Sequence, residues 1–184
     1  QGEEEAEGTK VNIALQQYNR IFVESNGAPD CIIPILAGAP FSIFVPTAES
    51  IAAEREAGRL DTWQQKHDFI MYHICFGNPV ADRLPQPSTM HRTALVEKGT
   101  LRNPTVYVAS EGNGDLTVTD AMGNTRHVVK GGENIFTYDY NLILSTTKNP
   151  PRAGIGAIKT MKDLVPESTS PGVIHIIDGV LRHN

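Results

Sequence analysis

The strongest constraint on the fold is a run of β-branched and aliphatic residues near the end of the chain, at positions 172–181. This run, GVIHIIDGVL, holds a histidine and an aspartate and has a glycine near each end. It has the length of a buried strand and too many β-branched residues to favour a helix. Because buried strands are apolar on both faces, we expect residues 173–181 in the middle of a sheet, with residues 41–45 in the same β core.

A strand followed by a capped helix is predicted in the first third of the chain. Residues 41–45, FSIFV, alternate with the period of a strand. We expect Pro46 to end this strand. Thr47 is a good N-cap for a helix that continues to Ala57 and stops at Gly58.

Helical patterns occupy the first half of the chain and short extended patterns the second. Apolar residues at helical spacing predict a helix over residues 10–25, and Asp61 is expected to cap another that runs to about residue 76. These helices precede the strands, which predicts an α+β fold: a β-sandwich or partly open barrel core with the N-terminal helices packed on it. Glycine-containing turns separate the predicted strands, at residues 106–108, 116–119, 127–129 and 135–144.

Two stretches are interpreted as irregular because of their prolines. The first is residues 82–90, and the second is residues 146–156, TTKNPPRAGIG. A long loop in a compact domain is usually functional or disordered. Arg152 in the second loop is therefore a candidate anion contact at a binding surface; a tolerated surface insertion is the alternative.

The charge of the chain is concentrated at its start. The net charge is −5, and four glutamates lie in the first nine residues, which leaves about −1 for the rest. We interpret residues 1–9 as an acidic flexible tail and residues 10–184 as a single domain. A nearly neutral body without a basic stripe argues against nucleic acid as a partner. No apolar run is long enough to form a transmembrane segment.

Several segments resemble signatures of the fasciclin (FAS1) domain family. The terminal run is similar to the C-terminal signature of that domain, and residues 41–51, FSIFVPTAESI, are similar to its first signature. Residues 70–74, IMYHI, resemble its central Tyr-His segment, and residues 162–164, KDL, more weakly resemble its Asp-Ile/Leu motif. Order and spacing agree. The chain is therefore identified as resembling a single-domain member of the family, over residues 10–182.

The resemblance implies a secreted or surface-associated protein, with a signal peptide removed before Gln1. In animal adhesion members of the family, a Tyr-His region and the Asp-Ile/Leu motif are implicated in integrin binding. By this likeness Tyr72, His73, Asp163 and Leu164 are candidate binding residues. The helical pattern leads to a second expectation for His73. Because His73 adjoins the apolar row of its predicted helix, we expect its side chain to be buried and hydrogen-bonded.

Motifs for catalysis, cofactors and metals are missing from the sequence. It has no nucleophile elbow, no phosphate or dinucleotide loop and no metal-ligand spacing, so we expect no cofactor and no metal. His175 and Asp178 are three residues apart on a strand and point to opposite faces, so they do not pair. Cys31 and Cys75 are compatible with one disulfide or with two buried thiols.

Two classes of function remain. The first is a secreted or surface-associated fasciclin-type module that binds a protein or glycan without catalysis. The second is an enzyme, or an auxiliary protein of an oxidative biosynthetic pathway, that binds a small apolar metabolite. A ligand-sized cavity beside Tyr72, His73 or the proline-rich loop would favour the second class, and a flat surface would favour the first. The oligomeric state is left open by the sequence.

Overall fold

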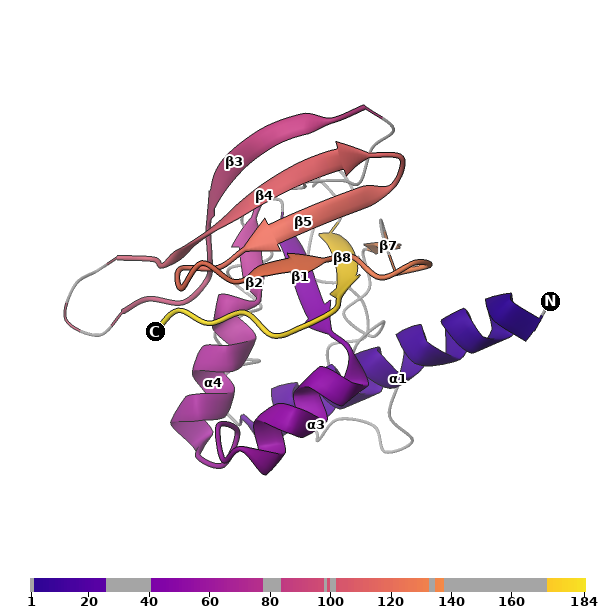
Figure 1. Ribbon diagram of the computed structural model, residues 1–184. Helices are drawn as coiled ribbons and strands as arrows, with labels where there is room; N and C mark the ends of the chain where they lie inside the picture. The colour runs from indigo at the N-terminus through magenta and orange to yellow at the C-terminus, as the bar shows by residue number, and fades with distance from the viewer. Residues whose placement is uncertain are drawn as a thin grey trace.

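The computed structural model describes residues 2–25, 41–77, 84–97, 99, 102–132, 135–137 and 172–184, and these residues form helices and two four-stranded sheets (Figure 1). The predicted α+β class is confirmed. The helices are α1 (Gly2–Glu24), α3 (Ala48–Glu56) and α4 (Trp63–Tyr72). The strands are β1 (Phe41–Pro46), β2 (Ile74–Phe76), β3 (Gln86–Arg92), β4 (Thr105–Gly112), β5 (Asp115–Thr119), β6 (Thr125–His127), β7 (Ile135–Thr137) and β8 (Gly172–Ile177).

The terminal strand lies inside a sheet, as its apolar sequence predicted. In the sheet of order β2-β1-β8-β7, β8 pairs in parallel with β1 and antiparallel with β7. Ile43 lies opposite Ile174 in the parallel pair, and both side chains are buried. The strand is shorter than predicted. It ends at Ile177, and residues 178–184 continue as an irregular segment.

Helix α1 begins earlier than predicted. It starts at Gly2, so the acidic residues that were predicted to form a flexible tail over residues 1–9 lie in its first turns. Glutamate has a high intrinsic helix propensity, which is consistent with this earlier start. Further along, α1 packs on α3, α4 and β1 through side chains that repeat at helical spacing: Ala14, Leu15, Tyr18 and Ile21.

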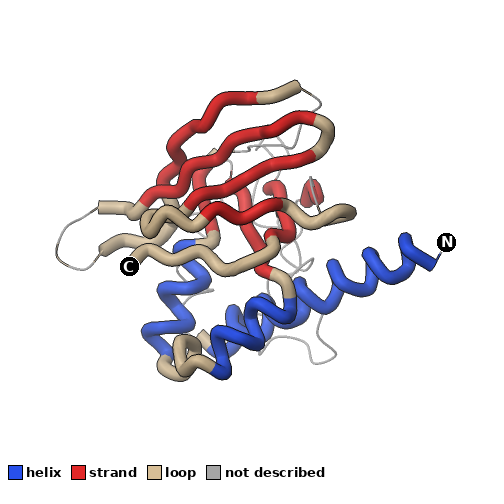
Figure 2. The backbone as a smooth tube through the Cα atoms, in the orientation of Figure 1, coloured by secondary structure: helices blue, strands red, loops and turns tan. Residues whose placement is uncertain are grey.

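Each of the two shorter helices, which are blue in Figure 2, begins after a capping threonine. Thr47 caps α3 as predicted, with its side-chain oxygen accepting a hydrogen bond from the Ser50 backbone N–H at 3.4 Å. Helix α4 is capped by Thr62 and not by Asp61, because Thr62 and Gln65 form a reciprocal capping box.

The predicted end of α4 is wrong. The helix stops at Tyr72, with His73 as its C-cap, and Ile74–Phe76 leave as strand β2. These residues pair antiparallel with β1, so pairing in the sheet overrides the local helical pattern.

Residues 82–90 were predicted to be irregular, but most of their described part forms strand β3. This strand pairs antiparallel with β4 at the edge of the second sheet, whose order is β3-β4-β5-β6. Pro87 is tolerated because an edge strand need not donate along its open side. Strands β4 and β5 include the predicted segments, and β6 ends at His127, after which Val128 forms an isolated bridge with Ile177.

Among the described helices, none is long and apolar enough to cross a membrane. The buried apolar residues form one cluster that joins the helices to both sheets. The expectation that the terminal strand and residues 41–45 share one β core is confirmed.

Candidate functional site

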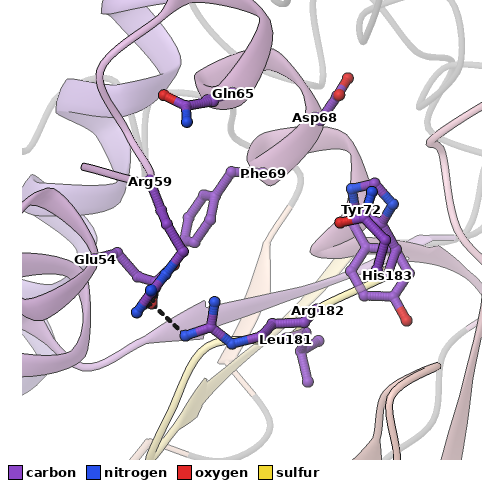
Figure 3. A pocket seen from close by; sticks show the side chains of 10 residues that line it. Glu54, Arg59, Gln65, Asp68, Phe69, Tyr72, Leu181, Arg182 and His183 are labelled. Atoms are coloured by element: carbon purple, nitrogen blue, oxygen red, sulfur yellow. Dashed lines mark hydrogen bonds and ion pairs between the residues drawn. The ribbon is translucent and has the colours of Figure 1, made fainter. Parts of the chain in front are cut away.

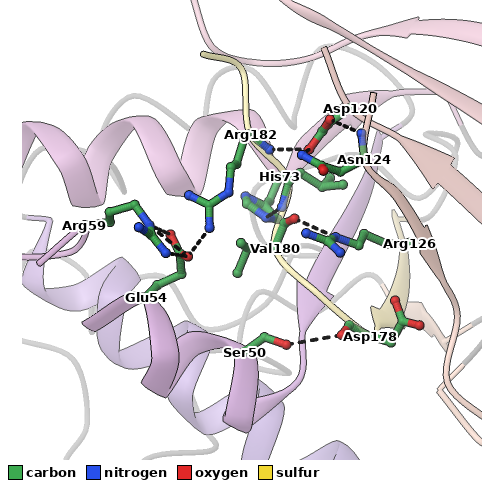
Figure 4. A network of polar contacts seen from close by, with 11 residues as sticks. Ser50, Glu54, Arg59, His73, Asp120, Asn124, Arg126, Asp178, Val180 and Arg182 are labelled. Atoms are coloured by element: carbon green, nitrogen blue, oxygen red, sulfur yellow. Dashed lines mark hydrogen bonds and ion pairs between the residues drawn. The ribbon is translucent and has the colours of Figure 1, made fainter. Parts of the chain in front are cut away.

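The C-terminal end of α4 meets residues 178–184, which we call the C-terminal segment. Tyr72 and His73 lie at this junction, and both are buried. Polar contacts tie the C-terminal segment to the helices and to the turn between β5 and β6 (Figure 4). The junction therefore brings the central Tyr-His segment together with the end of the chain.

Both ring nitrogens of His73 are used inside the protein. Its Nδ1 lies 2.7 Å from the Phe69 carbonyl oxygen, and its Nε2 lies 3.0 Å from the Leu181 backbone nitrogen. Because the Leu181 N–H can only donate, Nε2 accepts and Nδ1 carries the proton, which makes the imidazole neutral. Burial lowers the pKa of His73 to about 4. The prediction that His73 is buried and hydrogen-bonded is confirmed.

Tyr72 links α4 to the second sheet. Its hydroxyl donates to the Thr105 carbonyl oxygen at 2.9 Å and accepts from the Ala121 N–H at 3.0 Å. Burial raises the pKa of Tyr72 to about 12. The polar atom of this candidate binding residue is thus engaged within the fold, and its ring packs beside His183 with 5.4 Å between centroids.

Asp120 holds the C-terminal segment from the β5–β6 turn. Its Oδ1 accepts hydrogen bonds from the backbone nitrogens of Met122 and Asn124, at 3.0 and 2.8 Å. The same carboxylate accepts from the Arg182 backbone nitrogen at 2.8 Å. One buried carboxylate therefore shapes the turn and fixes the chain that crosses it.

The first residues of the C-terminal segment are bound as well. The Arg126 Nε donates to the Val180 carbonyl oxygen at 2.9 Å, and the Asp178 carboxylate accepts from the His127 N–H at 3.0 Å. His175 is buried within β8, whereas Asp178 is exposed and lies just after the end of that strand, so the alternation expected of one strand does not extend to Asp178.

A small pocket lies between α3, α4 and the C-terminal segment (Figure 3). Its volume is about 260 Å³. The Glu54 carboxylate in this pocket accepts from two guanidinium groups: Arg59 Nε lies 3.0 and 3.1 Å from its oxygens, and an Arg182 terminal nitrogen lies at 2.6 Å. The other residues that line the pocket are Gln65, Asp68, Phe69, Tyr72, Leu181, His183 and Asn184.

A larger cavity of about 400 Å³ lies between α1, the start of α3 and the end of β8. Its apolar lining includes Ile13, Val129 and Ile176, and Lys10 and Lys130 are among its charged residues. The volume lies within the range of small-molecule sites, which is about 300–1,000 Å³.

Only some of the candidate binding residues lie in the part of the chain that the structure describes. Tyr72 and His73 lie together at the junction, whereas Arg152, Asp163 and Leu164 lie outside the described residues. A sequence signal was available for one residue that the prediction missed. Glu54 follows Ile51 by three positions, on the buried face of α3, and a buried carboxylate needs a partner.

Metal and thiol chemistry have little support in the described part of the chain. No group of three or more histidine, cysteine or acidic side chains there could hold a metal ion. Cys75 is a buried free thiol, and burial raises its pKa, which disfavours the reactive thiolate.

Comparisons with known proteins identify the fold. No family model matches the sequence, and no curated protein matches it. The structure is similar to that of the FAS1 domain pair of the insect cell adhesion molecule fasciclin I, with a TM-score of 0.58 and 17% sequence identity over 92% of this chain. This chain spans 45% of the length of that domain pair. The fold is fasciclin-like, as the sequence signatures predicted.

Proposed function

We propose that the chain is a fasciclin-type adhesion module that binds a protein partner without catalysis, in a secreted or surface-associated form. We further propose that residues 10–184 form a single domain of this kind. The likeness to an adhesion molecule supports the proposal at the level of the fold. The observation that carries it is the exposure of strand β3.

Strand β3 contributes no buried side chain to the protein. It is one of the two edge strands of its sheet, and none of its seven residues is buried. Met90 lies directly opposite Tyr107 of β4, and these side chains are 59% and 44% exposed. The two form an apolar pair on the solvent side of the sheet, which we call the β3 surface.

The chemistry of the β3 surface suits a protein more than a glycan. Methionine and tyrosine are enriched where proteins bind one another, because they bury apolar area. An edge strand also offers unpaired backbone groups to an extended segment of a partner. Pro87 and the charge of Arg92 make unspecific pairing along this edge less favourable. We therefore expect a protein partner to pack on Met90 and Tyr107.

The substitution Met90→Glu should abolish most of the binding, because a carboxylate would be buried in the interface without a partner. We expect attachment of protein-coated beads to cells, or to one another, to fall by about tenfold or more. The matched control is Met122→Glu in the β5–β6 turn, since Met122 is 58% exposed. Attachment that survives Met90→Glu in a normally folded protein, or attachment lost on removing glycans alone, would contradict this proposal.

A second candidate function rests on the cavity of about 400 Å³. A small apolar metabolite would fit its lining, as an auxiliary protein of an oxidative pathway requires. The substitution Ala48→Trp should fill this cavity and weaken binding of the neutral fluorophore 1-aminoanthracene by about tenfold or more. Ala52→Trp is the control, because Ala52 lies exposed on the same helix. Equal binding to both variants would exclude the cavity as the site.

A further inference from the structure

The pocket beside Tyr72 carries an excess of positive charge at one end. The Glu54 side chain is only 7% exposed, and Arg59 and Arg182 both bind its carboxylate. Two guanidinium groups around one carboxylate leave a net charge of about +1. Figure 3 shows both groups converging on Glu54 at the same side of the pocket.

The Arg182 guanidinium has donors left for a ligand. A guanidinium offers five N–H donors. Among the described residues, this group donates one hydrogen bond, from a terminal nitrogen to Glu54. The side chain is 31% exposed, so its remaining donors reach the pocket. Because Glu54 holds one side of the planar group, Arg182 presents its other donors in a fixed orientation, which suits bidentate recognition of a carboxylate.

The rest of the pocket limits which ligand bodies can accompany the carboxylate that Arg182 would bind. The rings of Phe69, Tyr72 and His183 line it, so the body of the ligand would contact aromatic faces. At about 260 Å³, the pocket is smaller than typical sites for drug-sized molecules.

Asp68 affects how many negative charges a ligand of this pocket can carry. Its carboxylate also lines the pocket and accepts a hydrogen bond from Gln64 Nε2 at 2.8 Å. A second negative charge on the ligand would be repelled here. The pocket therefore favours a ligand with one carboxylate over a ligand with two.

We propose that this pocket binds a compact monocarboxylate with an aromatic or short apolar body. The carboxylate accepts from Arg182, with Arg59 beside it, and the body packs on Phe69 and Tyr72. This site is separate from the β3 surface and does not depend on the function proposed for that surface. The same chemistry could come from a free acid or from an acidic side chain of a protein.

Calorimetric and saturation-transfer NMR titrations with benzoate test the site. We expect benzoate to bind the unmodified protein and terephthalate, its dicarboxylate relative, to bind at least tenfold more weakly. The substitution Arg182→Gln should weaken benzoate binding by at least tenfold. Arg20→Gln is the matched control, because Arg20 is an exposed arginine of α1 that does not line the pocket.

A capped Phe-Glu dipeptide distinguishes the two sources of the carboxylate. If benzoate binds in an Arg182-dependent way, the site accepts a free acid; if only the dipeptide does, the site serves an acidic side chain of a protein. If Arg182→Gln does not fold, Arg59→Gln is used, and it should weaken binding in the same direction. Absence of binding by both probes, or binding that neither substitution changes, would overturn the proposal.

Discussion

Replacing His73 by alanine is expected to lower the free energy of unfolding by about 3 kcal/mol. The substitution leaves the Leu181 N–H and the Phe69 carbonyl without the partners that the ring provides. It also opens a cavity, since His73 is fully buried and its ring centroid lies 4.2 Å from that of Phe69. Urea unfolding followed by circular dichroism measures the difference.

His67→Ala is the matched control on the same helix. The His67 ring is partly exposed, stacks on Trp63 at 5.0 Å and lies 3.2 Å from an Asp68 oxygen. These surface contacts contribute little, so we expect a loss of less than about 1 kcal/mol. Equal losses for both variants would show that His73 does not hold α4 to the C-terminal segment.

The internal hydrogen bonds of His73 also make it less suitable as a binding residue. A partner that contacted the polar atoms of Tyr72 or His73 would have to displace Thr105, Ala121 or the C-terminal segment. The exposed Met90 and Tyr107 need no such rearrangement. This difference is why we propose the β3 surface as the protein interface.

Local patterns in the sequence predicted the parts of the fold that depend on local chemistry. The apolar run of β8 and the cap at Thr47 are such features; the cap lies where it was expected, and the strand begins there but ends earlier, at Ile177. Strand β2 was mistaken for helix because its three residues continue the apolar pattern of α4, and only pairing with β1 reveals it. Strand β3 was missed because its side chains do not alternate between buried and exposed.

The candidate site was predictable only in part for a related reason. His73 adjoins the apolar row of its helix, so its burial follows from local spacing. The pairing of Glu54 with Arg182 joins residues 128 positions apart. Side-chain spacing within one helix or strand carries no information about such a contact, which depends on how the elements pack.

Acid is expected to destabilise the protein through the same histidine. Burial is the largest cause that lowers the pKa of His73 to about 4, and the nearby His183 lowers it further. The bond to Phe69 and the charges of Glu54 and Asp120 raise it by less. Protonation would also remove the acceptor that Nε2 provides to the backbone.

The direction of the effect follows from the difference between the folded and unfolded chains. In the unfolded chain the pKa of His73 returns to its ordinary value of 6.5. Between pH 6.5 and pH 4 the unfolded chain binds more protons at this residue than the folded one, so stability falls as the pH is lowered through this range. From His73 alone we expect a loss of about 2–3 kcal/mol between pH 7 and pH 4.5.

Comparing the pH dependence of two variants isolates this contribution. His73→Gln removes the titrating ring, so it should lose about 2–3 kcal/mol less than the unmodified protein on acidification from pH 7 to pH 4.5. Carboxylates that lie far from His73 contribute equally to both proteins and cancel in the difference. His67→Gln should retain the full acid sensitivity, because His67 is not the buried group. If His73→Gln lost as much stability in acid as the unmodified protein, the histidine would be free to take up a proton in the fold, and the neutral ring derived from its two hydrogen bonds would be wrong.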